Sequence, residues 1–269
     1  MKNTYQLLDS GDQQKWERFG DYTLLRPCPQ AVWRPLGHQN EVDASFTRDE
    51  GNKWSFYRKL PASWTIQLHG VQLKISPTDF GHLGVFPEHA SLWDWMGPHI
   101  SAGSKVLNLF AYSGGASLSA ALAGAHVCHL DASKGMVDWA RENAKENGLE
   151  KAPIRWIVDD ALKFLKREIK RGVRYEGIIL DPPTFGRGSS GETFKIERDI
   201  IPLLELCRDL LSDKPRFVIV SCHTPGFTPV VLAHLFKQVF KLEPEAGEML
   251  LQSPKTLCIP SGTYVRAAL

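Results

Sequence analysis

The sequence predicts an α/β fold: a Rossmann-like, mostly parallel sheet with an antiparallel C-terminal strand, preceded by a small N-terminal β extension. Residues 105–133 contain a strand, a glycine-bearing turn, a helix and a second strand in succession. Short apolar runs then alternate with helix-like segments as far as residue 240. This alternation predicts parallel strands joined by right-handed crossovers, with helices on both faces of the sheet. Residues 249–269 carry turn residues and no long helical period, which favours a terminal strand pair.

The unit at residues 105–133 organises the chain. Its parts are a strand at 106–110, a turn with sequence Ala-Tyr-Ser-Gly-Gly at 111–115, a helix at 116–123 and a strand at 126–130. Glycine permits a sharp bend and a close approach of a ligand, and the helix start offers free N–H groups. Asp131, at the end of the second strand, can accept hydrogen bonds from ribose hydroxyls. The unit is therefore suited to hold a nucleoside, although the glycine spacing differs from the G-x-G-x-x-G dinucleotide pattern.

The N-terminal extension is expected to span residues 1–95. Residues 64–76 alternate around His69-Gly70 and predict a β-hairpin. Residues 77–96 mix glycine, proline and aromatic residues before a helix that begins near Ala90, which indicates a loop able to cover a ligand.

The main domain is expected to span residues 96–269. After the first unit, its predicted helices are 133–147, 161–171, 197–211 and 228–240, and its predicted strands are 154–158, 177–180 and 216–221. Ser133 is placed to cap the first of these helices and Gly148 to end it. The terminal strand pair is expected to turn at residues 260–262, between Pro260 and Gly262.

Composition sets limits on the compartment and the partners. The 269 residues are 43% hydrophobic and 23% charged, with a net charge of +2, which is expected of a soluble globular protein. The N-terminus has no apolar signal-peptide core, and no run is long enough to span a membrane. Five scattered cysteines without a C-x-x-C pair suggest neither a disulfide framework nor a zinc site. We therefore expect a cytoplasmic protein without a metal.

Acids recur where the predicted strands end. Asp131, the pair Asp159-Asp160 and Asp181 each follow an apolar strand, and ligands of such sheets bind at this edge. Carboxylates would repel the phosphates of NAD or ATP but would favour a cationic nucleoside. S-adenosylmethionine fits, because its sulfonium is positive and its ribose offers two hydroxyls. Asp131 would bind the ribose, and Asp160 would accept from the adenine amino group or cap the next helix.

The run Asp181-Pro182-Pro183-Thr184-Phe185 is the most specific signal in the sequence. Two prolines stiffen the turn and remove two N–H donors, which leaves carbonyl groups for a bound base. Phe185 could stack on that base. We therefore expect the acceptor base to bind at this turn.

These motifs resemble a known family. NLFAYSGGASLSAALAGA, LDASKGMVDWARENAKENGL, VDDALKFL and ILDPPTFGRG are similar to class I methyltransferases of large-subunit ribosomal RNA, in particular the cytosine-C5 and guanine-N7 enzymes and their uncharacterised relatives. A reversed last strand is also typical of class I methyltransferases. The resemblance covers about residues 65–269, and the Asp-Pro-Pro-Thr-Phe form is similar to the guanine-N7 type. No PUA domain is recognisable, and Ala90 stands where the family would have a basic residue.

The resemblance implies S-adenosylmethionine as cofactor and RNA, in particular ribosomal RNA, as substrate, with no membrane partner; the oligomeric state stays open. Phe86 and Glu88 are implied as cofactor contacts by the resemblance alone. The full set of expected cofactor-binding residues is Phe86, Glu88, Asn108, Phe110, Ala111, Tyr112, Ser113, Gly114, Gly115, Asp131, Ala132, Ser133, Asp159, Asp160, Ala161 and Asp181. The expected catalytic residues are Asp181, Pro182, Pro183, Phe185 and Cys222.

Cys222 leaves the chemistry open. In the cytosine-C5 enzymes a cysteine in a Ser-Cys context attacks C6 of the ring, and Ser221-Cys222-His223 matches that position. A small buried cysteine that ends a strand is the equally weighted alternative. Two further alternatives remain: methylation of a small molecule or protein, and a non-catalytic module that binds nucleosides or RNA.

Overall fold

The computed structural model describes residues 4–37, 41–49, 51–187, 191 and 193–269. The chain folds as two compact units. The first comprises Met1–Ala90 and Leu250–Ser261, and the second comprises Ser91–Met249 and Gly262–Leu269. The C-terminal strand pair is therefore shared between the two units along the chain.

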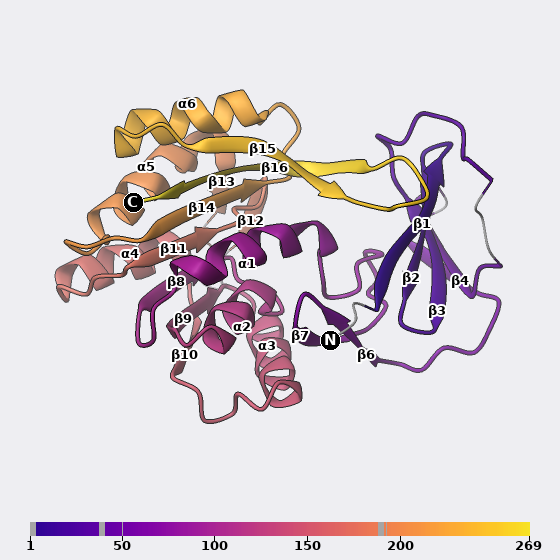
Figure 1. Ribbon diagram of the computed structural model, residues 1–269, viewed down its shortest axis with the longest axis horizontal. Coiled ribbons are helices and arrows are strands. Elements are labelled where there is room, and N and C mark those ends of the chain that lie inside the picture. The colour runs from indigo at the N-terminus through magenta and orange to yellow at the C-terminus, as the bar shows by residue number, and fades with distance from the viewer. Residues whose placement is uncertain (1–3, 38–40, 50, 188–190, 192) are drawn as a thin grey trace. The chain divides into compact units, whose positions relative to one another are not determined.

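The first unit is built on a five-stranded sheet in the order β1-β2-β3-β4-β5, in which only β3 and β4 pair in parallel (Figure 1). Its strands are β1 (Tyr5–Gly11), β2 (Gln14–Phe19), β3 (Tyr22–Pro27), β4 (Ala44–Thr47) and β5 (Lys53–Phe56). The predicted hairpin is confirmed as β6 (Trp64–Leu68) and β7 (Val71–Ile75). His69 and Gly70 both have positive φ, at 45° and 83°, as a two-residue turn of primed type requires. A short 3-10 helix, η1 (Pro87–His89), ends this part of the chain.

A C-terminal segment completes the core of the first unit. Leu251 and Ile259 are buried against Leu7, Cys28 and Ala31. The Thr256 hydroxyl donates to the buried Asp9 carboxylate at 2.9 Å. These contacts link residues about 250 positions apart, which explains why sequence order alone does not indicate this part of the unit.

The second unit contains a seven-stranded sheet in the order β10-β9-β8-β11-β14-β16-β15 (Figure 1). Its strands are β8 (Lys105–Leu109), β9 (His126–Asp131), β10 (Ile154–Val158), β11 (Gly177–Leu180), β14 (Phe217–Cys222), β15 (Glu245–Leu251) and β16 (Ile259–Ala268). The first five strands in this order pair in parallel, whereas β16 is antiparallel to β14. The predicted mostly parallel sheet with a reversed C-terminal strand is confirmed.

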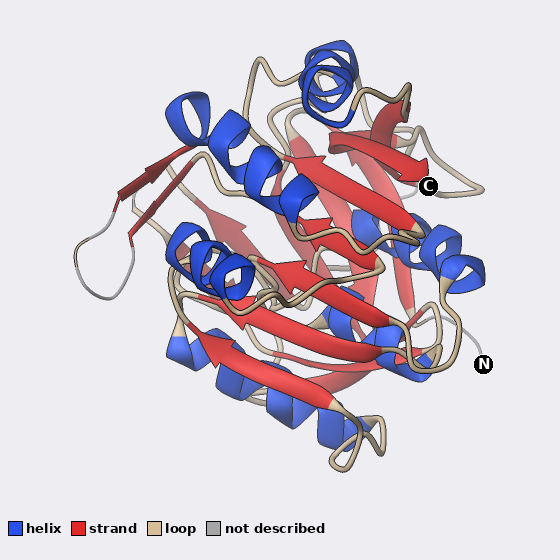
Figure 2. Ribbon diagram, turned by 90° about the vertical axis from the view of Figure 1, so that its left-hand side faces the viewer, coloured by secondary structure: helices blue, strands red, loops and turns tan. Residues whose placement is uncertain are grey.

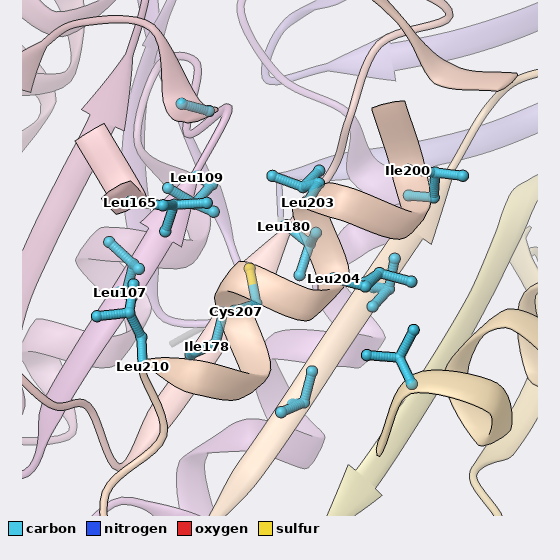
Figure 3. Close-up of a cluster of buried hydrophobic side chains, with 14 of the residues drawn as sticks. Leu107, Leu109, Leu165, Ile178, Leu180, Ile200, Leu203, Leu204, Cys207 and Leu210 are labelled. Carbon is cyan, nitrogen blue, oxygen red and sulfur yellow. The ribbon is translucent and has the colours of Figure 1, made fainter. Parts of the chain in front are cut away.

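Helices cover both faces of this sheet (Figure 2). They are α1 (Ala90–Met96), η2 (Gly97–His99), α2 (Gly115–Leu122), α3 (Lys134–Glu146), α4 (Ala161–Lys170), α5 (Ile196–Asp209) and α6 (Pro229–Phe240). Leu92 and Met96 of α1 and Ala120 of α2 pack on one face. On the other face, Leu203, Leu204 and other apolar residues of α5 point to the strands (Figure 3). No helix in the described ranges is long and apolar enough to cross a membrane.

The helix ends follow local sequence signals. Ser133, as predicted, accepts a hydrogen bond from the N–H of Met136 at the start of α3. Asp160 and Thr228 cap α4 and α6 in the same way. Gly148 follows α3 with φ of +67°, which suits a glycine after a helix.

Two features differ from the sequence expectation. The predicted turn at 260–262 is wrong, because β16 already begins at Ile259 and the connection lies before it, at residues 252–258. Gly262 lies within β16 at φ of +126°, where an added Cβ would lie 2.6 Å from Met249 Cε, so this position in the strand favours glycine. A short ribbon, β12 (Phe185–Arg187) with β13 (Thr193–Lys195), also follows the Asp-Pro-Pro turn and was not anticipated.

Candidate active site at the carboxyl edge of the sheet

The strand register brings the predicted site segments to one edge of the second unit. Leu180 of β11 pairs with Leu109 of β8 and with Val220 of β14, and Leu109 pairs with Leu130 of β9. The residues that follow these partners therefore emerge side by side. Strand order reverses between β8 and β11, because the chain proceeds from β8 to β9 and β10 on one side and to β11 and β14 on the other. Ligands of open α/β sheets bind at such a switch point.

The turn after β8 has a backbone that few sequences tolerate. Phe110, Tyr112 and Gly114 have positive φ of 56°, 52° and 96°. Positive φ is uncommon for residues with a side chain and concentrates at functional sites. Gly114 ends the turn as the N-cap residue of α2, and a glycine has no side chain that could accept from the first N–H groups of the helix.

The glycines of this turn also admit close neighbours. A Cβ at Gly115 would lie 2.5 Å from the Trp93 ring of α1, and one at Gly114 would lie 3.0 Å from Ala140 Cβ of α3. The buried Asn143 amide of α3 donates to the Ser113 carbonyl at 2.9 Å. Trp93 and Asn143 are positioning residues that the sequence did not reveal. The sequence does hold one indication for Asn143. It is a polar residue at a position that falls on the buried face of an amphipathic helix, with Val137, Ala140 and Ala144.

Asp131 joins the turn to the end of β9. Its Oδ2 accepts from the N–H of Tyr112 at 2.9 Å, and its Oδ1 accepts from the N–H of Ser133 at 2.8 Å. A carboxylate offers about four lone-pair sites, so capacity remains for a diol. Burial raises the pKa of the Asp131 carboxyl above its ordinary value, and the two N–H groups oppose that shift. Ala132 and Ser133 follow as exposed residues.

The acids after β10 already have partners in the fold. Asp159 forms an ion pair with Arg167 of α4 and accepts from the N–H of Asp160 at 2.9 Å. Asp160 accepts from the N–H of Lys163 at 2.9 Å as the helix cap. Ala161 is buried as the first residue of α4. The capping interpretation of Asp160 is thus confirmed, while its contact with adenine stays a prediction.

Asn108 lies in β8 within a buried polar chain rather than at the open edge. Its amide donates to Ser117 Oγ at 2.9 Å, and Ser117 Oγ lies 2.9 Å from Nδ1 of His129. His129 is fully buried, and burial with the nearby Arg141 charge lowers its pKa to about 3. These hydrogen-bonded side chains join β8, α2 and β9 beneath the turn, so Asn108 helps to hold the elements that carry the site.

Asp181 follows β11 at the switch point. The Ser221 hydroxyl of β14 donates to its Oδ1 at 2.8 Å, and His223 Nε2 lies 3.8 Å from its Oδ2. The Asp181 side chain is 27% exposed. The neighbouring strand therefore orients a carboxylate that still reaches the surface of the site.

The rest of the Asp-Pro-Pro turn leads into the ribbon. Pro182 is buried and Pro183 is partly buried, while Phe185 at the start of β12 is 48% exposed. The Arg187 guanidinium lies 5.8 Å from the centre of the Phe185 ring. The Thr184 hydroxyl lies 2.7 Å from the Thr224 hydroxyl, which connects this turn to the segment after β14. An exposed aromatic ring thus follows the oriented Asp181 carboxylate by four positions in the chain.

Cys222 ends β14 inside the apolar core. It is 1% exposed and packs with the cluster that includes Leu180 and Val220. Burial raises the pKa of its thiol, and the negative charge of Asp181 adds to this effect, while hydrogen bonding with Thr224 opposes it. The burial of Cys222 and the raised pKa of its thiol support the alternative that this cysteine is a packed core residue and not a nucleophile.

Phe86 and Glu88 belong to the first unit. Phe86 precedes η1, and Glu88 within η1 is 7% exposed. Both line a cavity of about 140 Å³ whose cationic lining residues are Lys15, Arg26 and Arg48. Their contact with a cofactor remains a prediction from the resemblance.

Comparisons with known proteins agree with this geometry. A family model described as S-adenosylmethionine-dependent methyltransferase matches residues 35–233. The crystal structure of a SAM-dependent methyltransferase from Agrobacterium tumefaciens is 36% identical, with a TM-score of 0.93, and the match covers 99% of this chain and 91% of that one. SMU.776, a methyltransferase complexed with S-adenosylhomocysteine, is 19% identical with a TM-score of 0.81 and matches 99% of this chain and 76% of its own, which shows the shared fold.

Curated relatives share the sequence over a shorter range. Ribosomal RNA large subunit methyltransferase K/L from Shewanella loihica is 34% identical over 194 residues, which is 70% of this chain. The match spans 26% of that relative's length, so this chain corresponds to about a quarter of the curated relatives it matches.

The donors and acceptors at the edge suit the cofactor that the family requires. Asp131 offers acceptors for a ribose, and carboxylates at neighbouring strand ends favour a cationic sulfonium. The predicted methyltransferase activity, fold and S-adenosylmethionine cofactor are confirmed by the family match and by the Agrobacterium structure. This chain belongs to the S-adenosylmethionine-dependent methyltransferase family.

Proposed function

We propose that this chain methylates a base of ribosomal RNA, and that the methylated atom is N7 of guanine. RNA is the acceptor suggested by the relatives named ribosomal RNA large subunit methyltransferase K/L. The exposed Phe185 ring, four positions after Asp181 in the chain, supports a planar, stacking acceptor.

The burial of Cys222 carries the choice of atom. Transfer to C5 of cytosine needs a thiolate that adds to C6, and a second group that removes the C5 proton. The Cys222 thiol is 1% exposed, its pKa is raised, and it lies among apolar side chains. A buried thiol of raised pKa is both poorly ionised and inaccessible to a base. Methylation at a ring nitrogen requires no such nucleophile.

The chemistry at N7 asks for alignment and charge stabilisation. The cofactor supplies a methyl group activated on a sulfonium. The N7 lone pair bonds to the methyl carbon as the carbon–sulfur bond breaks, and sulfur retains the bonding electrons. No proton leaves, and the positive charge passes to the guanine ring. Asp181, oriented by Ser221, would stabilise that ring charge, and Phe185 would hold the ring in plane.

Transfer in vitro tests this proposal. Ribosomal RNA from a strain without the protein is incubated with the enzyme and methyl-labelled S-adenosylmethionine, and the product nucleosides are identified by mass spectrometry. The proposal predicts labelled 7-methylguanosine. Labelled 5-methylcytidine would contradict the choice of atom, and absence of label in RNA would contradict RNA as the acceptor.

A further inference from the structure

The outer surface of α4 carries charge of a single sign, and we call it the α4 basic face: Lys163, Lys166, Arg167 and Lys170. At 3.6 residues per turn these four positions lie within an arc of about 100° around the helix, so they share one face. All four residues are exposed. The one acid of α4, Glu168, is fully buried on the opposite side of the helix.

The opposite side of α4 is already used within the fold. Phe164 and Leu165 are buried in the cluster that packs α4 and α5 against the sheet. The Glu168 carboxylate pairs with Arg155 at 2.8 Å and with Arg171 at 3.1 Å. Basic helices that bind membranes insert an apolar face into the lipid, and the apolar face of α4 is occupied by the core. The α4 basic face therefore suits a partner that offers negative charge alone.

The spacing of these cations opposes the stability of the helix. Lys163 and Arg167 are four positions apart, as are Lys166 and Lys170, and like charges at this spacing repel each other on a helix. Lys163 also lies in the first turn, where the helix dipole disfavours a cation. Arg167 pairs with Asp159, whereas no ion pair joins Lys166 or Lys170 to an acid of the described ranges. The stability of the helix itself thus explains this arrangement poorly.

The α4 basic face begins at the edge of the sheet that carries the candidate active site. Asp160, the N-cap of α4, follows β10, and Val158 of β10 pairs with Asp131 of β9. α4 packs beside α5, which begins directly after the β12–β13 ribbon and the Asp-Pro-Pro turn. An RNA strand with one base at Asp181 can therefore continue its backbone towards α4.

We propose that the α4 basic face binds the phosphate backbone of the RNA substrate. Lysine and arginine side chains neutralise phosphates and release the counterions that surround a nucleic acid, which gives binding that weakens steeply with salt. Contacts to phosphates position a nucleic acid without reading its bases. This inference rests on the proposed RNA acceptor and adds the surface that holds the substrate outside the reacting atoms.

Fluorescence anisotropy at several salt concentrations, with a fluorescein-labelled single-stranded oligoribonucleotide of mixed sequence, tests the face. Lys166→Gln with Lys170→Gln should weaken binding and lower the slope of log K against log salt by about 0.7 per lysine. Lys166→Arg with Lys170→Arg keeps both charges and should retain the affinity and the slope. Thermal unfolding followed by circular dichroism verifies that each variant is folded.

A matched control removes the same charge elsewhere. Lys145→Gln with Lys237→Gln changes exposed lysines on α3 and α6 and should leave the slope unchanged. Wild-type affinity and slope in the glutamine pair of α4 would overturn the inference. Binding of the wild type to phosphatidylglycerol vesicles that depends on Lys166 and Lys170, with unchanged binding to RNA, would assign the face to a membrane surface and overturn it as well.

Steady-state transfer to ribosomal RNA gives a second readout. Lys166→Gln with Lys170→Gln should raise the KM for RNA and leave kcat unchanged, because the face contacts the substrate away from the methyl group. The affinity for S-adenosylmethionine should also stay unchanged. A lower kcat at an unchanged KM for RNA would contradict a role in holding the backbone.

The two proposals fail separately. If wild-type protein methylates ribosomal RNA while the glutamine pair of α4 binds RNA as wild type does, the inference about α4 falls and the proposed function stands. If wild-type protein neither binds nor methylates RNA, the proposed function falls and the inference falls with it.

Discussion

The Asp131 carboxylate accepts a hydrogen bond from the backbone N–H of Tyr112 at 2.9 Å and thereby fixes the turn after β8 to the end of β9. Tyr112 has a positive φ of 52°, so the contact stabilises a backbone that residues with side chains seldom adopt. One carboxylate therefore shapes the turn, and we expect the same carboxylate to accept hydrogen bonds from the cofactor ribose.

Replacement of Asp131 should weaken cofactor binding. Asp131→Ala removes a charged acceptor and should reduce the affinity for S-adenosylmethionine by about 1.5–3 kcal/mol, measured by titration calorimetry. Asp138→Asn is the control, because Asp138 is an exposed acid on α3 that pairs with Lys134 and Arg141. Equal affinities for wild type and Asp131→Ala would show that the ribose binds elsewhere.

The pair of Asp181 and Ser221 should control transfer more than cofactor binding. Asp181→Ala should abolish methyl transfer to RNA while S-adenosylmethionine still binds. Ser221→Ala removes the 2.8 Å hydrogen bond to the carboxylate and should lower kcat by roughly 10- to 100-fold, as expected for one bond to a charged group. Single-turnover kinetics at saturating cofactor measure both effects. A near wild-type rate for Asp181→Ala would remove this turn from the acceptor site.

Cys222 should prove dispensable for chemistry. Cys222→Ser keeps the volume of a buried side chain and should retain methyl transfer, with a loss confined to thermal stability. Wild-type protein should form no covalent adduct with RNA that contains 5-fluorocytosine, as judged by denaturing electrophoresis. A trapped adduct that disappears in Cys222→Ser would instead establish cytosine C5 as the target.

The buried His129 should make stability depend on pH. Its pKa falls from an ordinary 6.5 to about 3 in the folded state, so the unfolded chain binds the proton more readily. The contribution of neutral His129 to the free energy of unfolding is complete above pH 6.5 and is lost as the pH falls toward 3. Between pH 7 and pH 5 wild type should lose about 2 kcal/mol more free energy of unfolding than His129→Asn does.

Urea denaturation at the two pH values measures this difference. His126→Asn, at an exposed position of the same strand, should behave as wild type. A pH dependence shared by wild type and His129→Asn would contradict the assignment of the effect to His129.

Local signals made much of the second unit predictable. Apolar runs of strand length and the cap at Ser133 indicated the elements of the parallel sheet. The acids at the ends of β9, β10 and β11 indicated the edge where the site lies. The Asp-Pro-Pro turn was equally visible, because proline restricts the backbone regardless of its surroundings.

Features that depend on distant partners were not predictable. Asn143 supports the turn from a helix 30 residues away, and Thr256 donates to Asp9 across 247 residues. Asn108 is an expected cofactor contact, and the sequence does not reveal that its amide donates to Ser117 Oγ of the following helix. The turn at 260–262 was misplaced because Pro260 and Gly262 are turn residues by composition, while both lie within β16, which has β15 as its other neighbour in the sheet.

Nucleoside analysis of ribosomal RNA tests the central claim most directly. RNA from a strain that lacks this protein is compared, by mass spectrometry, with RNA from its parent and from strains that express wild type or Asp181→Ala. The account predicts that 7-methylguanosine falls in the deletion strain, returns with wild type and does not return with Asp181→Ala. Identical methylated nucleosides in the deletion strain and its parent would contradict it.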